Sequence, residues 1–350
     1  MKNETRLRRG WTTGACATAA AVAAFRALRG GNFPDSVEIE LDNGKRPVFV
    51  IALKQREGKR CTAGIIKDAG DDPDVTHQAM VVVSVEHGAT GSGVSFRAGE
   101  GVGTVTRMGL PLDVGEPAIN PAPRQMIQNA IKREGGDDVI IEIAVPGGEE
   151  LAQKTWNPKL GIKGGLSILG TTGIVIPYSC SAWIHSIQQG IDVARAAGIQ
   201  HIGAATGKLS EALLRKRGLD ETATIDMGDF VGGFLKYLRK HPVECVTIAG
   251  GAGKISKLAN GANDLHSRRS NIDFYFLAGL AKNAGASESL VQRIKGAESI
   301  GEVLLMCKGL NIGDAIASAA HKRVVTMLPE STAVELLVIN RSGILIGRAE

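Results

Sequence analysis

A short acidic segment carries the densest cluster of reactive side chains in this sequence. Half of the residues in Lys67–Asp74 are aspartates. Carboxylates crowded together repel one another, so one can hold a raised pKa that suits proton transfer. The pattern predicts Asp68, Asp71 and Asp72 as catalytic candidates, with Lys67 keeping a neighbour ionised or holding a substrate carboxylate. The alternatives are a hard-metal site, although the EF-hand spacing is not matched, and an acidic turn with Asp caps.

A second candidate site lies at the start of a predicted helix. Thr12 and Thr13 precede the Ala-rich segment 15–29, which ends at a Gly pair. Hydroxyls and free amides at a helix N-terminus bind anions, but simple N-capping by either threonine is the alternative. Cys16, in the first turn, is predicted to be a buried thiol, with a nucleophile activated by the helix dipole as the other interpretation.

The glycine-rich segment Gly99–Gly103 has the spacing G-x-G-x-G. The residues after it, 104–107, favour a strand and not a helix. Without a helix N-terminus, the dinucleotide-binding mechanism fails. We therefore predict a strand-to-strand connection that lines a ligand.

Several loops in the second half follow predicted strands, where open α/β sheets bind ligands. Their candidate residues are Thr171, Thr172, Asp226, Gly250, Gly251 and Gly253. Asp226 could accept hydrogen bonds from ribose hydroxyls or could cap a helix. The segment Gly250–Lys254 lacks the P-loop pattern, so ATP use is not indicated. His266 and Arg268 lie in a loop that could grip carboxylates, with an ordinary solvated loop as the alternative.

The elements that position these residues divide the chain into two parts. Residues 1–165 contain short Val- and Ile-rich strands with two helices, which predicts an α+β domain. Residues 166–331 alternate strands and helices, which predicts an α/β domain with a mostly parallel sheet. The end of the chain, 332–350, is a predicted hairpin of Ala333–Ile339 and Ile344–Arg348. Because this hairpin is rich in β-forming residues, like the first half of the chain, we expect it to pair with the sheet of the first domain.

Composition narrows the function classes. The 350 residues carry a net charge of +5 without a long basic block, and no apolar run could span a membrane, so neither nucleic acid nor a membrane is an expected partner. Five dispersed cysteines fit a reducing cytosol, so we expect a cytoplasmic protein. The histidines and cysteines show no zinc spacing, and no bound metal is expected. The 45 glycines favour close approach of the backbone to a ligand. Homo-oligomerisation is possible.

Long ordered strings in this sequence resemble the cobalt-precorrin-5B C1-methyltransferase family of cobalamin biosynthesis. The strings are Arg9–Ala17, Thr62–Thr76, Gly101–Thr106, Gly115–Pro121, Thr155–Ile162 and Gly164–Gly173. Two regions depart from the family pattern: Ile176–Ser181, which replaces a usually acidic stretch, and Gly251–Ser267, which matches more loosely.

The resemblance implies methyl transfer from S-adenosylmethionine to C1 of a ring-contracted cobalt tetrapyrrole. We expect this donor to bind in the α/β domain, at the six residues named above, because their loops lie at predicted strand ends. Substrate carboxylates would be held by Thr12, Thr13, Lys67, Arg107, His266 and Arg268. Two other functions stay open at this point: a nicotinamide-dependent precorrin reductase, which the poorly placed glycine motif disfavours, and a non-catalytic tetrapyrrole-binding protein.

Overall fold

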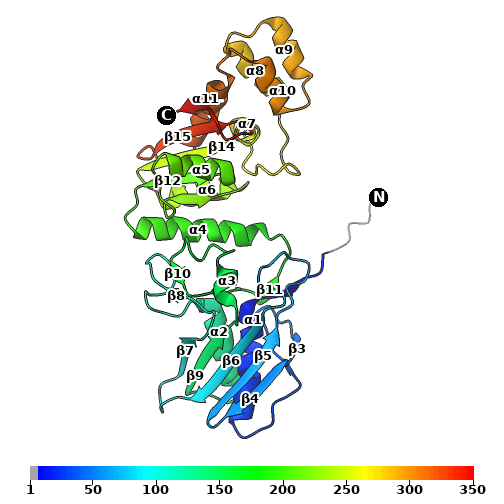
Figure 1. Cartoon of the computed structure of the whole chain (residues 1–350), viewed down its shortest axis with the longest axis vertical. Helices are drawn as coiled ribbons and strands as arrows, with labels where there is room; N and C mark the ends of the chain where they lie inside the picture. Colours follow the sequence, from blue (N-terminus) through cyan, green and yellow to red (C-terminus); the bar gives the residue numbers. More distant parts are fainter. Residues whose placement is uncertain (1–6) are drawn as a thin grey trace. The chain divides into compact units, whose positions relative to one another are not determined.

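The computed structural model describes residues 7–350 and divides into two compact units, Met1–Cys180 and Ser181–Glu350 (Figure 1). The first unit extends beyond the predicted boundary at residue 165. The reason is strand pairing, because β11 (Ile174–Val175) pairs antiparallel with β1 (Gly10–Trp11). The segment after 165 therefore belongs to the first unit.

The first unit is built on a five-stranded sheet in the order β4-β5-β6-β9-β7. Its strands are β4 (Leu53–Glu57), β5 (Arg60–Ile66), β6 (Met80–His87), β7 (Val94–Ala98) and β9 (Val139–Ala144). All neighbours are antiparallel except β7 and β9. The smaller elements are β2 (Ser36–Glu38), β3 (Val48–Val50), β8 (Thr104–Val105), β10 (Ile162–Lys163) and α3 (Gly148–Ala152). The expected α+β composition of this part is confirmed.

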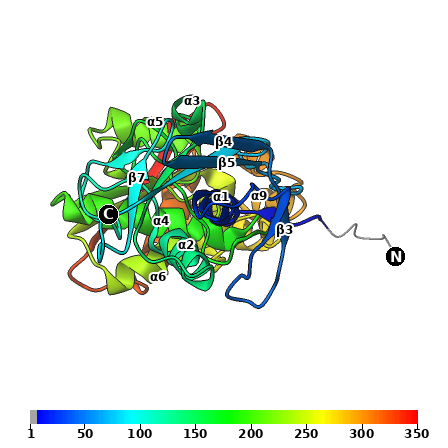
Figure 2. The same ribbon diagram turned by 90° about the horizontal axis from the view of Figure 1, so that it is seen from below.

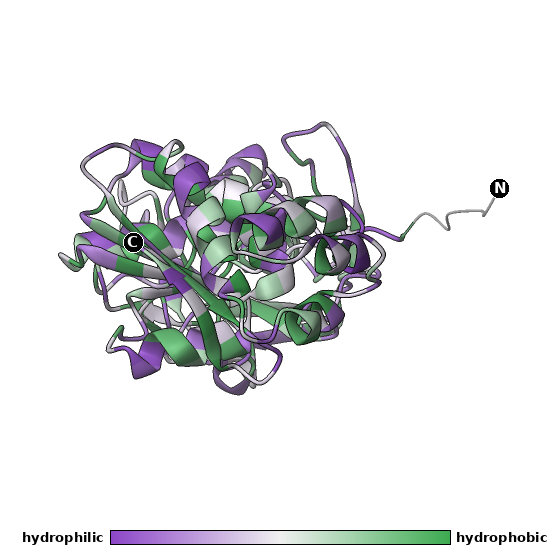
Figure 3. Ribbon diagram, turned by 90° about the horizontal axis from the view of Figure 1, so that it is seen from above, coloured by the Kyte–Doolittle hydropathy of each residue, from purple (hydrophilic) through white to green (hydrophobic). Residues whose placement is uncertain are grey.

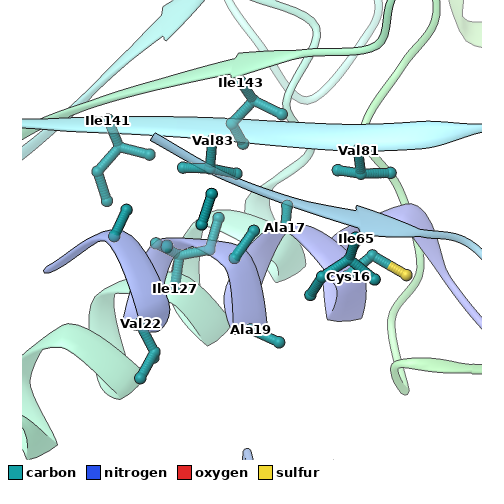
Figure 4. Close-up of a cluster of buried hydrophobic side chains, with 14 of the residues drawn as sticks. Cys16, Ala17, Ala19, Val22, Ile65, Val81, Val83, Ile127, Ile141 and Ile143 are labelled. Atoms are coloured by element: carbon teal, nitrogen blue, oxygen red, sulfur yellow. The ribbon is translucent and has the colours of Figure 1, made fainter. Parts of the chain in front are cut away.

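Helix α1 (Thr13–Leu28) forms the centre of this unit, with α2 (Pro121–Arg133) packed beside it. Figure 2 views α1 nearly end-on, with β5 on one side and α2 on the other. Fourteen of its sixteen residues are buried, and most of them are alanine, whose small side chain lets the helix approach both neighbours closely. Figure 4 shows Val81, Val83 and Ile141 from the sheet and Ile127 from α2 around it.

The second unit contains a five-stranded sheet in the order β13-β12-β14-β15-β16. The strands are β12 (His201–Ala205), β13 (Thr224–Asp226), β14 (Cys245–Gly251), β15 (Ala333–Ile339) and β16 (Leu345–Ala349). The first four run parallel, and β16 is antiparallel to β15. The predicted strand–helix alternation with a mostly parallel sheet is therefore confirmed.

Helices cover this sheet, since consecutive residues of β14 and β15 are buried, as in strands packed on both faces. The helices of this unit are α4 (Cys180–Ala196), α5 (Lys208–Lys216), α6 (Val231–Lys240), α7 (Ala252–Ala259), α8 (Phe274–Asn283), α9 (Glu288–Lys295), α10 (Ile300–Met306) and α11 (Ile312–Val325). Of these, α8 packs against α9 and α11. Helix α5 packs on β12–β14, while α11 packs on β15 and β16. Green and purple stretches adjoin along the helices in Figure 3, as expected for amphipathic helices.

The terminal hairpin does not return to the first unit, so that prediction is wrong. Strand β15 pairs in parallel with β14, from Ala333 opposite Cys245 to Ile339 opposite Gly251. Six consecutive residues of β15 are buried, which requires helices on both faces of its sheet. A high content of β-forming residues predicts that a segment is a strand, but it does not predict which sheet the strand joins. In the second unit, helices cover the sheet that β15 joins.

Within residues 7–350, no helix is both long and apolar enough to cross a bilayer. The same residues contain no group of three or more His, Cys, Asp or Glu side chains arranged to hold a metal ion.

Candidate functional site

Three sequence motifs meet at the N-terminus of α1 in the first unit. The amide of Trp11 donates to the Asp68 carbonyl at 2.8 Å, which joins the acidic loop to β1. The amide of Thr12 donates to the Gly173 carbonyl at 3.1 Å, and β1 pairs with β11. The acidic loop, the threonine motif and the loop at 170–173 thus form one contiguous structure.

Two glycines permit this close assembly. A Cβ on Gly10 would lie 2.0 Å from the carbonyl carbon of Ala69. Gly70 has a φ of +69°, and a Cβ there would lie 2.2 Å from the Arg8 carbonyl oxygen. Only glycine allows the two backbones to touch at these positions. The acidic loop is therefore held rigidly against β1.

Thr12 and Thr13 are buried in the structure and bond to protein groups. The Thr12 hydroxyl accepts from the Ala15 amide at 3.1 Å, as an N-cap does. The Thr13 hydroxyl bonds both the amide and the carbonyl of Leu169. These contacts support the capping interpretation over anion binding. Cys16 is the buried thiol that was predicted, and burial raises its pKa to about 12, so it stays protonated.

Lys67 is almost fully buried, at 1% exposure, and its ammonium contacts Asp74 at 2.6 Å. Burial alone would raise the pKa of Asp74. The charge of Lys67, together with hydrogen bonds from Lys67 and Thr76, outweighs burial and lowers that pKa. Lys67 thus keeps a neighbouring carboxylate ionised, which was one of its two expected roles. A buried ammonium with a partner is not placed to hold a substrate carboxylate.

Asp68 does not fit the expectation of a raised pKa. Hydrogen bonds from the Arg8 guanidinium to both carboxylate oxygens, aided by the Gly70 amide, lower its pKa to about 2. A carboxylate with such a pKa accepts a proton poorly at neutral pH. Asp68 is therefore not the carboxylate with the raised pKa. The physical cause is Arg8, a residue outside the motif.

Asp71 and Asp72 remain the candidates for proton transfer in this loop. Oδ2 of Asp71 accepts the Arg8 amide at 2.5 Å, and Oδ1 of Asp72 accepts the Tyr178 amide at 2.8 Å. Both contacts fix the carboxylates in place, and within residues 7–350 neither carboxylate forms an ion pair. Tyr178 is 67% exposed and adopts a φ of +56°, which is unusual for a residue with a side chain. Its part in the loop could not be predicted, since 106 residues separate it from Asp72.

The other glycine-rich and basic candidates of the first unit lie away from helix termini. Gly99–Gly103 leads into β8, a strand, which confirms that it is no dinucleotide loop. A Cβ on Gly101 would lie 2.0 Å from the Val145 carbonyl oxygen, so that glycine serves backbone packing. Arg107 donates to the Lys159 carbonyl at 3.1 Å.

Four of the six predicted cofactor residues gather at one edge of the second unit. Because β12, β13, β14 and β15 are parallel, the loops that follow them meet at their carboxyl ends. Asp226 ends β13, Gly250 and Gly251 end β14, and Gly253 lies in the first turn of α7. The remaining two, Thr171 and Thr172, lie in the first unit, because their loop pairs through β11 with β1. The prediction that they belong to the α/β unit is therefore wrong.

Lys254 links the loops at this edge. Its ammonium donates to the Thr206 carbonyl at 2.6 Å and lies 3.0 Å from Oδ1 of Asp229. The Asp229 contact is an ion pair without hydrogen-bond alignment, and Oδ1 is buried with no donor aligned to it among residues 7–350. Lys254 thus fixes the loops after β12, β13 and β14 relative to one another.

The backbone at this edge includes a glycine with open space beside it. A side chain at Gly251 would meet no atom within 4 Å, and Gly251 caps α7. Oδ1 of Asp226 accepts the Gly228 amide at 3.2 Å, so this carboxylate stabilises its own turn. His266 and Arg268 lie in an exposed turn, where the Arg268 amide donates to the His266 ring. This turn adjoins the edge, because the amide of Leu265 donates to the Asp229 carbonyl at 2.9 Å.

Comparison with known proteins places the chain among enzymes of cobalamin biosynthesis. Residues 1–177 match the family described as CbiD, and residues 264–350 match the CbiD C-terminal domain. The cobalt-precorrin-5B C(1)-methyltransferase of Paramagnetospirillum magneticum is 55% identical over 100% of both chains. The protein of the same name from Bradyrhizobium sp. is 54% identical over 98% of this chain and 93% of its own.

A crystal structure of a cobalamin biosynthesis protein (cbiD) from Archaeoglobus fulgidus is also similar, at 29% identity and a TM-score of 0.40, over 75% of this chain and 83% of that chain. The resemblance found in the sequence motifs is confirmed by the full-length relatives. Since a family model covers more than half of the chain and relatives match it end to end, the chain belongs to the CbiD family.

Proposed function

We propose that this chain is a cobalt-precorrin-5B C1-methyltransferase, which transfers a methyl group from S-adenosylmethionine and releases cobalt-precorrin-6A. The observation that carries the proposal is the end-to-end similarity to relatives of that name. In this reaction the C1 carbon forms a bond to the methyl group, and the donor leaves as S-adenosylhomocysteine. The protein must align the two reactants and accept the proton that the macrocycle loses.

We place the donor at the carboxyl edge of the second unit's sheet. The strand order turns between β12 and β14, which is the point where open α/β sheets bind ligands. Gly250, Gly251 and Gly253 offer backbone that a ligand can approach, with open space at Gly251. Asp226 supplies a carboxylate at this edge, where Asp229 is already paired with Lys254, and a carboxylate suits the sulfonium cation and the ribose hydroxyls of the donor.

Replacing Asp226 by Asn should raise the dissociation constant for S-adenosylmethionine about 10- to 100-fold, as expected for losing a charge-assisted hydrogen bond. Asparagine keeps an acceptor for the Gly228 amide, so the turn is retained. Isothermal titration calorimetry measures the constant. Glu244→Gln is the matched control, because Glu244 is exposed and precedes β14 at the opposite edge. Equal affinities in both variants would move the donor elsewhere.

The function itself is tested with a labelled methyl donor. The purified protein is incubated with cobalt-precorrin-5B and S-adenosylmethionine labelled in the methyl group, and NMR locates the new methyl. We expect it on C1. Binding of the tetrapyrrole without methyl transfer would indicate a carrier, and oxidation of NADPH, followed by absorbance, would indicate a reductase. Either result contradicts the proposal.

A further inference from the structure

A cleft of about 410 Å³ lies in the second unit, in the size range of small-molecule sites. Its walls come from α10, the 307–311 connection, the first turn of α11 and the turn between β15 and β16. Much of the lining is apolar, and its larger members are Leu304, Leu305, Leu310, Ile312 and Ile346. Such a lining suits a ligand with a hydrophobic body.

The charged side chains that line the cleft are all positive. Arg341 and Lys308 are its charged lining residues, and both are exposed. Within residues 7–350, neither side chain forms a hydrogen bond or an ion pair. Cys307 also lines the cleft, but burial raises the pKa of its thiol, which therefore stays neutral. Two cations without partners above an apolar floor favour an anionic ligand.

The cleft adjoins the edge where we place the donor. Ile339 pairs with Gly251, and the next residue, Asn340, lines the cleft. A Cβ on Gly253 would lie 3.5 Å from Ile300, the first residue of α10. The donor loops and the cleft are therefore neighbours within one unit.

We propose that this cleft binds the acidic edge of the tetrapyrrole substrate, with Arg341 and Lys308 holding its acetate or propionate carboxylates. The ligand identity rests on the proposed function. S-adenosylmethionine carries a sulfonium and an ammonium against one carboxylate, so its net positive charge disfavours a site with two unpaired cations. The substrate combines carboxylates with a flat apolar ring, which matches both features of the cleft. Arg341 forms the stronger contact, since a guanidinium holds a carboxylate through two parallel hydrogen bonds.

The test measures binding of coproporphyrin, a stable flat tetrapyrrole with propionate side chains, to the full chain. Quenching of porphyrin fluorescence gives the dissociation constant. We expect Arg341→Met to raise it about 10- to 100-fold and Lys308→Met to raise it less. Arg341→Lys should recover part of the affinity, and added salt should weaken binding to the wild type. The S-adenosylmethionine dissociation constant should stay unchanged in all three variants.

Lys216→Met is the matched control, because Lys216 is an exposed cation in the last turn of α5, at the opposite edge of the sheet. It should bind coproporphyrin like the wild type. The inference is overturned if wild type does not bind coproporphyrin, if Arg341→Met binds it as wild type does, or if Arg341→Met weakens the donor instead. Failure of the proposed function looks different: coproporphyrin binding responds to Arg341, yet no labelled methyl reaches cobalt-precorrin-5B.

Discussion

Asp74→Asn should lower the free energy of unfolding by about 3 kcal/mol, because it leaves the Lys67 ammonium buried without a counter-charge. Lys67 is 1% exposed and Asp74 is 24% exposed, so the effect belongs at the lower end of the range for buried pairs. Asparagine keeps the oxygen that accepts from the Thr76 amide and hydroxyl, so the variant loses only the charge and the hydrogen bond from Lys67. Urea unfolding followed by circular dichroism measures the change.

The double variant Lys67→Met/Asp74→Asn is the control for this pair. It removes both charges, so it should unfold with a smaller loss than Asp74→Asn alone. If the double variant is less stable than the single variant, the buried charge is not the cause. The loop would then depend on Lys67 for packing.

The same pair predicts a dependence on acid. The folded-state pKa of Asp74 is lowered, so its contribution to stability is present above its unfolded pKa of about 3.9 and is lost as pH falls through the lower folded value. Asp68, whose folded pKa is about 2, adds to this loss in the same direction. Wild type should therefore lose stability below about pH 4 more steeply than Asp74→Asn, whose side chain does not titrate.

Either Asp71→Asn or Asp72→Asn should slow turnover about 10²- to 10⁴-fold, the usual cost of losing a positioned general base. Both carboxylates accept from backbone amides, those of Arg8 and Tyr178, and neither forms an ion pair among the residues that the structure describes. Asp68→Asn should change turnover only a few-fold, since its pKa of about 2 makes it a weak base. The measurement is the rate of methyl transfer at saturating donor and substrate.

Asp42→Asn is the matched control, because Asp42 is an exposed aspartate outside the acidic loop in the same unit. Thermal melts and donor calorimetry should match the wild type for Asp71→Asn and Asp72→Asn. If both of these variants turn over within a few-fold of the wild type, the loop is only an acidic turn and the proton acceptor lies elsewhere.

Most helices and strands could be predicted from local patterns. The Ala-rich segment became α1, and the strand after Gly99–Gly103 became β8. The alternation after residue 200 became a parallel sheet with crossover helices. These predictions succeeded because side-chain periodicity and Gly or Pro boundaries depend on nearby residues alone.

The candidate site was only partly predictable, because its decisive contacts join distant residues. Arg8 sets the pKa of Asp68 from 60 positions away, and Tyr178 holds Asp72 across 106. Neither residue shares a spacing pattern with the acidic loop. The role of Lys67 also depends on burial. The sequence predicts that this lysine could bind the substrate, but in the structure it is buried and pairs with Asp74.

The sequence by itself determined the family, the element types and the clustering of aspartates, since each is written in contiguous residues. Tertiary structure alone decided which sheet each strand joined and which carboxylate lost its proton most easily. Strand β15 joined β14, and the loop of Thr171 and Thr172 joined the first unit, through hydrogen bonds between segments far apart in the chain. Pairing partners, burial and the field of neighbouring charges arise only when such segments meet, and these are the quantities that set strand register and pKa.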